Sequence, residues 1–183
     1  MTINPQSPIA TRAATVDDAA QIAKLGAHVF SITFGHSVTA AQLKDFLDES
    51  YSLEATVKDI QDPHKDMVVA TNAHGTIVGF ALLTRGSSEP CIAHLDSTIE
   101  LQRLYVATDC HGQGIGKILA NQLEATARKE NFKYMWLGVW EENFIAQKVY
   151  GKMGYKLVGD HVFDVGGDLQ TDLIMLKELA SAT

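Results

Sequence analysis

The stretch His111-Gly112-Gln113-Gly114-Ile115-Gly116 decides how the fold is interpreted. It lies between an expected strand over residues 100–106 and an expected helix over 114–129. Its glycines permit a tight turn and a close approach of the backbone to a ligand. A turn that opens a helix directs free N–H groups at one point, and the helix dipole adds positive potential there. The turn therefore predicts a site for an anion such as a pyrophosphate, to which Lys117 would add charge.

Two common phosphate-binding motifs do not fit this turn. A P-loop would end in Gly-Lys-Ser/Thr, which is missing here. A Rossmann fingerprint needs the spacing G-x-G-x-x-G after a strand, and here the glycine spacing differs and several helices come first. A helix-entry loop without any ligand remains the alternative.

The rest of the chain predicts one α/β domain over residues 9–183, preceded by a flexible tail over 1–8. A strand–helix–strand–helix–strand run follows residue 100, so a parallel strand pair is expected at the centre of a mixed, mostly antiparallel sheet of about six or seven strands flanked by helices. The further expected strands are 9–14, 67–70, 76–83, 134–139, 155–163 and 172–176. The further expected helices begin at Thr15 and span 39–48, 53–60 and 143–153.

Composition and charge restrict the class of protein. The chain has 183 residues, of which 46% are hydrophobic and 20% charged, which is typical of an ordinary globular domain. The formal net charge of −7 argues against nucleic-acid binding. It favours a cationic substrate through steering, although solubility alone accounts for such a charge.

The expected compartment and metal content of the protein are inferred from motifs that the sequence does not contain. No apolar run approaches the ~20 residues of a membrane span, and the N-terminus lacks the pattern of a secretory signal. Cys91 and Cys110 do not form a CxxC pair. We therefore expect a cytoplasmic protein with no disulfide, no metal site and no membrane partner.

Two motifs resemble the GNAT superfamily of N-acetyltransferases. The family signature is Arg or Gln, two residues, Gly, one residue, then Gly or Ala, and here it reads His111-x-x-Gly114-x-Gly116. A later family motif, with an Asn that starts a helix, an Ala, and a Tyr before Gly-Phe/Tyr, matches Asn143, Ala146 and the run Tyr150–Tyr155. The resemblance runs from about residue 9 to the C-terminus and is specific over 100–155. His111 departs from the signature, which affects one side-chain contact and leaves the backbone cradle intact.

A narrower resemblance is to the PaiA-type diamine and polyamine acetyltransferases. It rests on the segments 100–106, 136–141, 161–163 and 170–175. The pair Phe144-Ile145 departs from this pattern, because the family more often has a polar pair with a second Asn there.

The resemblance implies a GNAT-like sheet whose parallel pair is splayed around acetyl-CoA, the cosubstrate. Backbone groups of the strand over 100–106 would pair with the pantetheine arm like an added strand. In the family a bulge in this strand turns an N–H toward the thioester carbonyl. The residues implied to bind the cosubstrate are Leu104, Tyr105, Val106, His111, Gly112, Gln113, Gly114, Ile115, Gly116, Lys117, Asn143, Tyr150 and Lys152.

Two residues are candidates for proton transfer. Tyr150 follows Asn143 by about two helical turns, so both project from nearly the same face. The resemblance gives Tyr150 the role of general acid for the leaving thiolate, and the alternative is a packed core tyrosine. Glu100 precedes the glycine turn at the spacing that some GNAT enzymes use for a catalytic base, and the alternative is a surface ion pair. Weaker candidates for the base are Glu141, Glu142, His94 and His161.

The function expected from these features is transfer of an acetyl group to a primary amine, such as spermidine or spermine, by direct attack. A protein or peptide N-acetyltransferase and a non-catalytic acetyl-CoA-binding module remain alternatives. The partner would be a small-molecule amine, with the protein a monomer or homodimer. Asp45, Asp48 and Glu49 would form either an acidic entrance for a polyamine or the solvated face of a helix.

Overall fold

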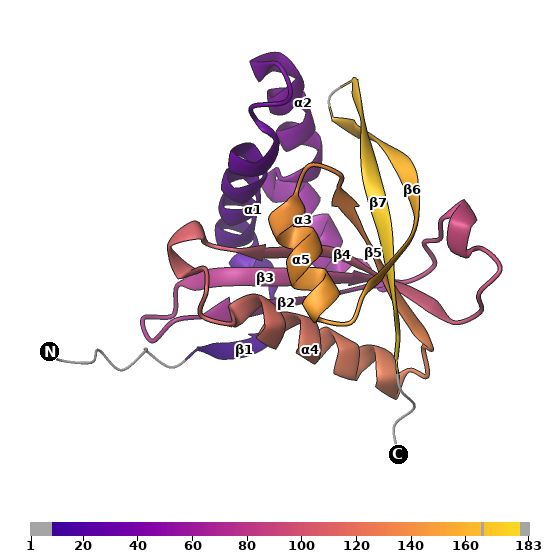
Figure 1. Ribbon diagram of the computed structural model, residues 1–183. Helices are drawn as coiled ribbons and strands as arrows, with labels where there is room; N and C mark the ends of the chain where they lie inside the picture. The colour runs from indigo at the N-terminus through magenta and orange to yellow at the C-terminus, as the bar shows by residue number, and fades with distance from the viewer. Residues whose placement is uncertain (1–8, 166, 180–183) are drawn as a thin grey trace, which may run out of the picture.

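The computed structural model describes residues 9–165 and 167–179, and the expected tail over 1–8 lies outside these ranges. One seven-stranded sheet has the order β1-β2-β3-β4-β5-β7-β6 (Figure 1). Every neighbouring pair is antiparallel except β4 and β5. The strands are β1 (Ala10–Ala13), β2 (Lys65–Thr71), β3 (Ile77–Thr84), β4 (Thr98–Val106), β5 (Tyr134–Trp140), β6 (Lys156–Val165) and β7 (Asp168–Glu178). The expected α/β fold with a mixed, mostly antiparallel sheet is confirmed.

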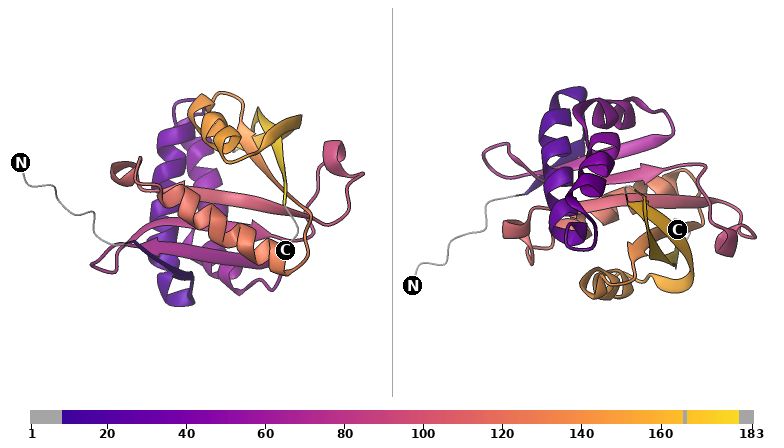
Figure 2. Two further views of the ribbon diagram at one scale, coloured as in Figure 1. Left: turned by 60° about the horizontal axis from the view of Figure 1, so that its bottom comes forward. Right: turned by 90° about the horizontal axis from the view of Figure 1, so that it is seen from above.

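Helices cover both faces of the sheet. They are α1 (Ala19–Phe34), α2 (Ala40–Ser50), α3 (Leu53–Gln61), α4 (Ile115–Lys129) and α5 (Phe144–Lys152). The first three lie together on one side of the strands, and α4 and α5 lie on the other (Figure 2). Strand β2 shows the consequence, since Val68 and Ala70 pack into the core under α4 while Met67 and Val69 pack into the core under α1. A strand buried on both faces reads as a continuous apolar run, as this one does.

One face of the helix after the glycine turn packs against the sheet. Ile115, Leu119 and Leu123 are buried against the sheet, whereas Ile118 is 43% exposed. Gly114 directly precedes α4 with a φ of 77°, in the left-handed region that glycine adopts without strain. The turn therefore opens the helix, as its sequence predicts.

The two largest differences from the expected boundaries are at the starts of α1 and β7. Thr15 does not start α1, because a 3-10 turn over Val16–Asp18 comes first. The Asp18 carboxylate accepts hydrogen bonds from the backbone and the hydroxyl of Thr15, which closes this turn. Strand β7 begins at Asp168 rather than at Asp172, because the β6–β7 hairpin stays paired up to its turn.

The parallel pair at the centre of the sheet is short. Strand β4 pairs with β5 only over residues 98–100, against 134–136, and the two strands then diverge. Strand β4 also carries a bulge, because Leu82 lies opposite Arg103 while the next residue of β3 lies opposite Leu101. Gln102 is thus the extra residue of β4, placed just beyond the point where the strands separate. The expected splay of the parallel pair is confirmed, and it leaves a gap in the middle of the sheet.

Candidate active site

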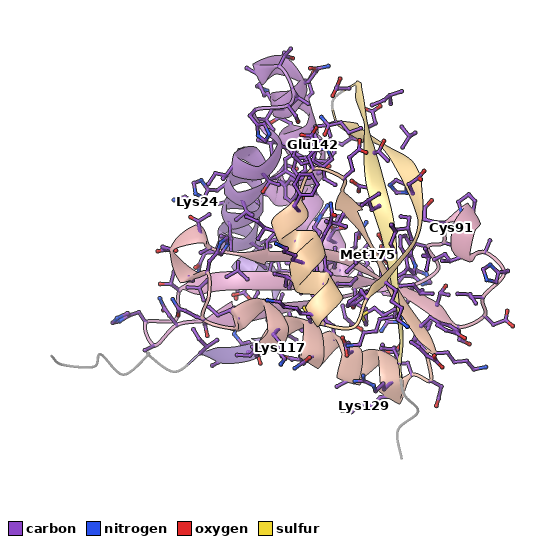
Figure 3. The ribbon with its side chains drawn as sticks, viewed as in Figure 1. Lys24, Cys91, Lys117, Lys129, Glu142 and Met175 are labelled. Carbon is purple, nitrogen blue, oxygen red and sulfur yellow. The ribbon has the colours of Figure 1, made fainter. Side chains whose placement is uncertain are left out.

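A cleft of about 1080 Å³ occupies the place where β4 and β5 diverge. Elements from both faces of the sheet line it, including α1, α4 and α5. Figure 3 labels Lys117 on α4 and Glu142 just before α5, and both side chains belong to the lining. The other sequence-predicted residues that line it are Glu100, Leu104, Tyr105, Val106, His111, Gly112, Gly114, Ile115, Gly116, Asn143 and Tyr150. Gln113 and Lys152 are exposed and do not belong to the lining, so cofactor binding by their side chains stays a prediction.

The glycine turn presents a row of free donors to this cleft. Within residues 9–165 and 167–179, none of the backbone N–H groups of 112–117 has a hydrogen-bond acceptor. A Cβ added at Gly112 or Gly114 would meet no atom within 4 Å, so the space above the turn is open. Unsatisfied N–H groups at the start of a 15-residue helix favour an anion. The turn therefore fits a pyrophosphate group.

His111 is held back toward β4. Its ring Nε2 lies 3.0 Å from the carbonyl oxygen of Val106. A carbonyl accepts only, so this nitrogen carries the hydrogen and donates it to Val106. That N–H is therefore directed at Val106 and not at the space above the turn. The departure from the family signature at His111 thus fastens the turn to the strand before it.

Asn143 and Tyr150 lie on α5, at the mouth of the cleft. Asn143 caps the helix, and its Oδ1 accepts the N–H of Ala146 at 3.1 Å. The ring of Tyr150 packs edge-on against Tyr155 at 5.9 Å between centroids. Burial raises the pKa of Tyr150 to about 12. Its hydroxyl therefore keeps its proton at neutral pH and is available as a donor.

Glu100 lies in the last paired position before β4 and β5 diverge, opposite Trp136. Burial raises the pKa of Glu100 above its usual range, and the nearby Glu89 adds to this rise. The nearby Ser87 hydroxyl has the largest effect in the other direction. A carboxylate with a raised pKa is a better proton acceptor than an exposed one.

Aromatic side chains line the part of the cleft that faces α1. Trp136, Gly138 and Trp140 alternate along β5 and share one face of the sheet. Phe34 and His36 contact the Trp140 ring at centroid distances of 5.1 and 5.6 Å. Neither Phe34 nor His36 is predicted from the sequence to belong to the site. A helix and a strand more than a hundred residues apart along the chain bring them together, and no local motif marks such a contact.

A second set of ionisable groups lies beside Glu100. The Nδ1 of His161 is 2.7 Å from Glu89, and its Nε2 is 3.9 Å from Asp172. Burial raises the pKa of Asp172 to about 6, an effect that Glu89 reinforces and His161 opposes. His161 and Asp172 line the cleft, and they face each other across the β6–β7 hairpin. No role is predicted from the sequence for Asp172 or Glu89, because the register of β6 and β7 brings them to this place.

Of the weaker sequence candidates for the base, His161 and Glu142 line the cleft and the other two do not. Those two, Glu141 and His94, are exposed. The acidic residues of α2 are exposed as well, and Asp48 pairs with Lys44 on the same helix. The structure therefore favours the solvated-face interpretation for α2.

The structure places a cleft between two splayed parallel strands, next to a glycine turn that starts a helix. A comparison of the sequence with known families agrees with this arrangement. Residues 35–155 match the Acetyltransferase (GNAT) family. The chain belongs to this family. As a GNAT protein it is an N-acetyltransferase that depends on acetyl-CoA, and the donors of the glycine turn fit the phosphates of that cosubstrate.

Relatives and solved structures agree with this membership. The GNAT chain is 31% identical over 162 residues to an uncharacterized N-acetyltransferase of Mycobacterium tuberculosis, covering 88% of this chain and 98% of the relative. It is 34% identical over 125 residues to a peptidyl-lysine N-acetyltransferase of Salmonella typhimurium, covering 67% and 73%. Its fold resembles that of a PaiA N-acetyltransferase from Thermoplasma acidophilum in complex with coenzyme A, with a TM-score of 0.75 at 22% identity, over 93% of this chain and 99% of that one.

Two further observations concern metals and membranes. Across the described part of this GNAT chain, no three His, Cys, Asp or Glu side chains come together as ligands for a metal ion. None of the described helices combines the length and the apolar character that a membrane span requires.

Proposed function

We propose that this enzyme transfers an acetyl group from acetyl-CoA to a primary amine of a diamine or polyamine, such as spermidine or spermine. The observation that carries the proposal is the acidic end of the cleft. Glu100 and Asp172 both line it, and Glu89 lies directly behind His161. Carboxylates around a half-enclosed cleft favour a cationic acceptor. The structural similarity to a PaiA N-acetyltransferase supports the same substrate class.

Direct attack by the amine places four demands on the site. The amine must be neutral, the thioester carbonyl must be polarised, the oxyanion must be held, and the leaving thiolate must receive a proton. In this proposal Glu100 takes the proton of the ammonium group, directly or through water. Its raised pKa supports that role.

The oxyanion and the leaving group are assigned to β4 and α5. The bulge at Gln102 interrupts the pairing of β4 with β3. A bulge leaves a residue unpaired, so a backbone N–H there is the proposed donor to the thioester carbonyl. Tyr150 is the proposed general acid, because its raised pKa keeps its hydroxyl protonated. Asn143 is proposed to contact the pantetheine arm.

Release of free thiol from acetyl-CoA, measured over a panel of amines and peptides, tests the proposal. We expect turnover with spermidine, spermine or a diamine, and a loss of about 100- to 10,000-fold in kcat for Glu100→Gln, because the base is removed. Asp160→Asn is the matched control, since it removes one acidic charge from an exposed position of β6. Failure of every amine to release thiol would contradict the proposal.

A second candidate function is acetylation of a lysine in a protein. The relative from Salmonella typhimurium, named a peptidyl-lysine N-acetyltransferase, favours it. The same panel decides between the two, because a lysine peptide with a higher kcat/KM than every polyamine would select this function. Cosubstrate binding without turnover of any acceptor would select a regulatory module, in which neither Tyr150→Phe nor Glu100→Gln changes an activity.

A further inference from the structure

Two buried polar atoms face the cleft with no partner. These are Oδ1 of Asp172 and Nε2 of His161, and neither has a hydrogen-bond partner within residues 9–165 and 167–179. The Asp172 side chain is 14% exposed and that of His161 is 26% exposed. A buried polar atom without a partner is costly, and such atoms are rare in proteins unless a ligand or water satisfies them.

The contact between His161 Nδ1 and Glu89 determines whether the free Nε2 is a hydrogen-bond donor or an acceptor. Nδ1 lies 2.7 Å from Glu89, whose carboxylate accepts a hydrogen bond, so Nδ1 carries the hydrogen. In the neutral ring Nε2 is then an acceptor. Asp172 Oδ2 is 3.9 Å from that nitrogen, which is too far for a hydrogen bond. With the ring in its neutral form, Oδ1 of Asp172 and Nε2 of His161 are two neighbouring acceptors, and a group with several N–H donors and a positive charge would satisfy both.

The position of these atoms separates them from the cosubstrate. Asp172 lies beside Gly138, since a Cβ added at Gly138 would be 3.1 Å from Asp172 Oδ2. Gly138 shares its face of β5 with Trp140, which contacts α1. The glycine turn and Tyr150 belong to the side of α4 and α5. The pair of free acceptors thus lies on the α1 side of the sheet, away from the residues proposed to bind the cosubstrate.

We propose that Asp172 and His161 form a subsite for the second amino group of a diamine or polyamine, the group that is not acetylated. The proposal deepens the proposed function and rests on it. The ammonium group donates to Asp172 Oδ1 and His161 Nε2, and Glu89 holds the ring through Nδ1. Carboxylates around an ammonium favour its charged form. Such surroundings suit an amino group that stays protonated, whereas the attacking amine must lose its proton at Glu100.

Paired diamines and monoamines of equal chain length test the subsite. The probes are putrescine against n-butylamine and cadaverine against n-pentylamine, each measured by thiol release. The wild-type enzyme should prefer the diamine by about 10- to 100-fold in kcat/KM, the effect of one hydrogen-bonded charge pair. Asp172→Asn should remove this preference by lowering diamine turnover alone. Asp160→Asn, one residue before His161, should leave the preference intact.

Glu89→Gln serves as a second variant in the same assay. The glutamine keeps an acceptor for the His161 ring and removes one negative charge, so the diamine preference should fall less than in Asp172→Asn. Equal losses for diamine and monoamine in Asp172→Asn would overturn the subsite while leaving the proposed function in place. A wild-type enzyme without diamine preference would overturn it as well.

A binding measurement separates this proposal from the proposed function. In the presence of coenzyme A, putrescine should raise the Tm of the wild-type enzyme more than n-butylamine does, and this difference should vanish in Asp172→Asn. Such a result without any amine turnover would support the subsite and contradict the proposed function. Equal stabilisation of the wild type by both amines would overturn the subsite.

Discussion

The two sides of the cleft are built from different parts of the chain. On the side of α4, one short segment over residues 112–117 supplies the free N–H groups, and all of its residues except Gln113 line the cleft. On the opposite side, side chains from three distant elements meet, since Glu89, Glu100 and His161 lie near one another. The first side uses the backbone and the second uses ionisable side chains. All enzymes that use acetyl-CoA bind the same pyrophosphate group, whereas the acceptor of the acetyl group differs from one enzyme to another.

The difference between the sides predicts which variants affect which substrate. A change on the side of α4 and α5 should alter cosubstrate binding or the departure of the thiolate for every acceptor. A change on the opposite side should alter the choice of acceptor and leave acetyl-CoA binding intact.

The largest effect is expected for Tyr150→Phe. Loss of the proton donor to the thiolate should lower kcat by about 100- to 10,000-fold with every amine, as measured by thiol release. Calorimetry should show an unchanged affinity for acetyl-CoA. The matched control is Tyr155→Phe, because the Tyr155 hydroxyl is also buried but lies outside the cleft lining. A Tyr150→Phe enzyme with wild-type kcat would show that Tyr150 only packs.

A smaller effect is expected at the glycine turn. Gly114→Asp places a negative charge beside the free N–H groups and should weaken acetyl-CoA binding by about 10- to 100-fold in Kd, measured by calorimetry. Gly114→Asn is the control, because it has nearly the same shape and the same backbone strain at a φ of 77° without the charge. Equal Kd values for the two variants would show that charge at the turn is unimportant.

The smallest effect concerns stability on the acceptor side. The pKa of Asp172 is raised to about 6 by burial, so the folded state binds a proton more tightly than the unfolded state does. The buried carboxylate charge of Asp172 therefore destabilises the folded protein. This effect is absent below the unfolded pKa of about 3.9 and complete above the folded pKa of about 6. Asp172→Asn removes the charge and should raise the free energy of unfolding by about 1–2 kcal/mol at neutral pH. His161, Glu89 and Glu100 are the other ionisable groups that face this region.

Urea unfolding of the wild type and of Asp172→Asn at neutral pH and at about pH 4 measures this difference. The gain in stability should shrink at the lower pH, where Asp172 is protonated in the folded state and about half protonated in the unfolded state. A variant that is less stable than the wild type at neutral pH would show that the carboxylate stabilises the fold.

The cosubstrate side could be predicted from the sequence because its signals are local. The spacing of Gly112, Gly114 and Gly116 before a periodic apolar segment is enough to indicate a turn that opens a helix, and the structure has that turn. The same holds for Asn143 as the cap of α5. The role of His111 could not be predicted in this way, because its hydrogen bond to the carbonyl oxygen of Val106 depends on how the strand and the turn approach each other.

The acceptor side could be predicted only in part. Glu100 stood out through its distance from the turn, and His161 was one of several weak candidates. Asp172 was not selected, because a lone acidic residue in a strand carries no local signal. Its importance comes from the register of β6 and β7, which places it opposite His161, and from the burial that raises its pKa.

The sequence by itself determined the α/β fold, the order of strands and helices, the family and the anion-binding turn. Each of these depends on residue spacing within a short segment, where backbone geometry relates sequence to structure directly. The tertiary structure alone decided the position of the bulge at Gln102, the residue at which β4 and β5 diverge, and the meeting of Glu89, His161 and Asp172. These features depend on strand register and on packing between segments far apart in the chain, because free acceptors and shifted pKa values arise only when such segments exclude water together.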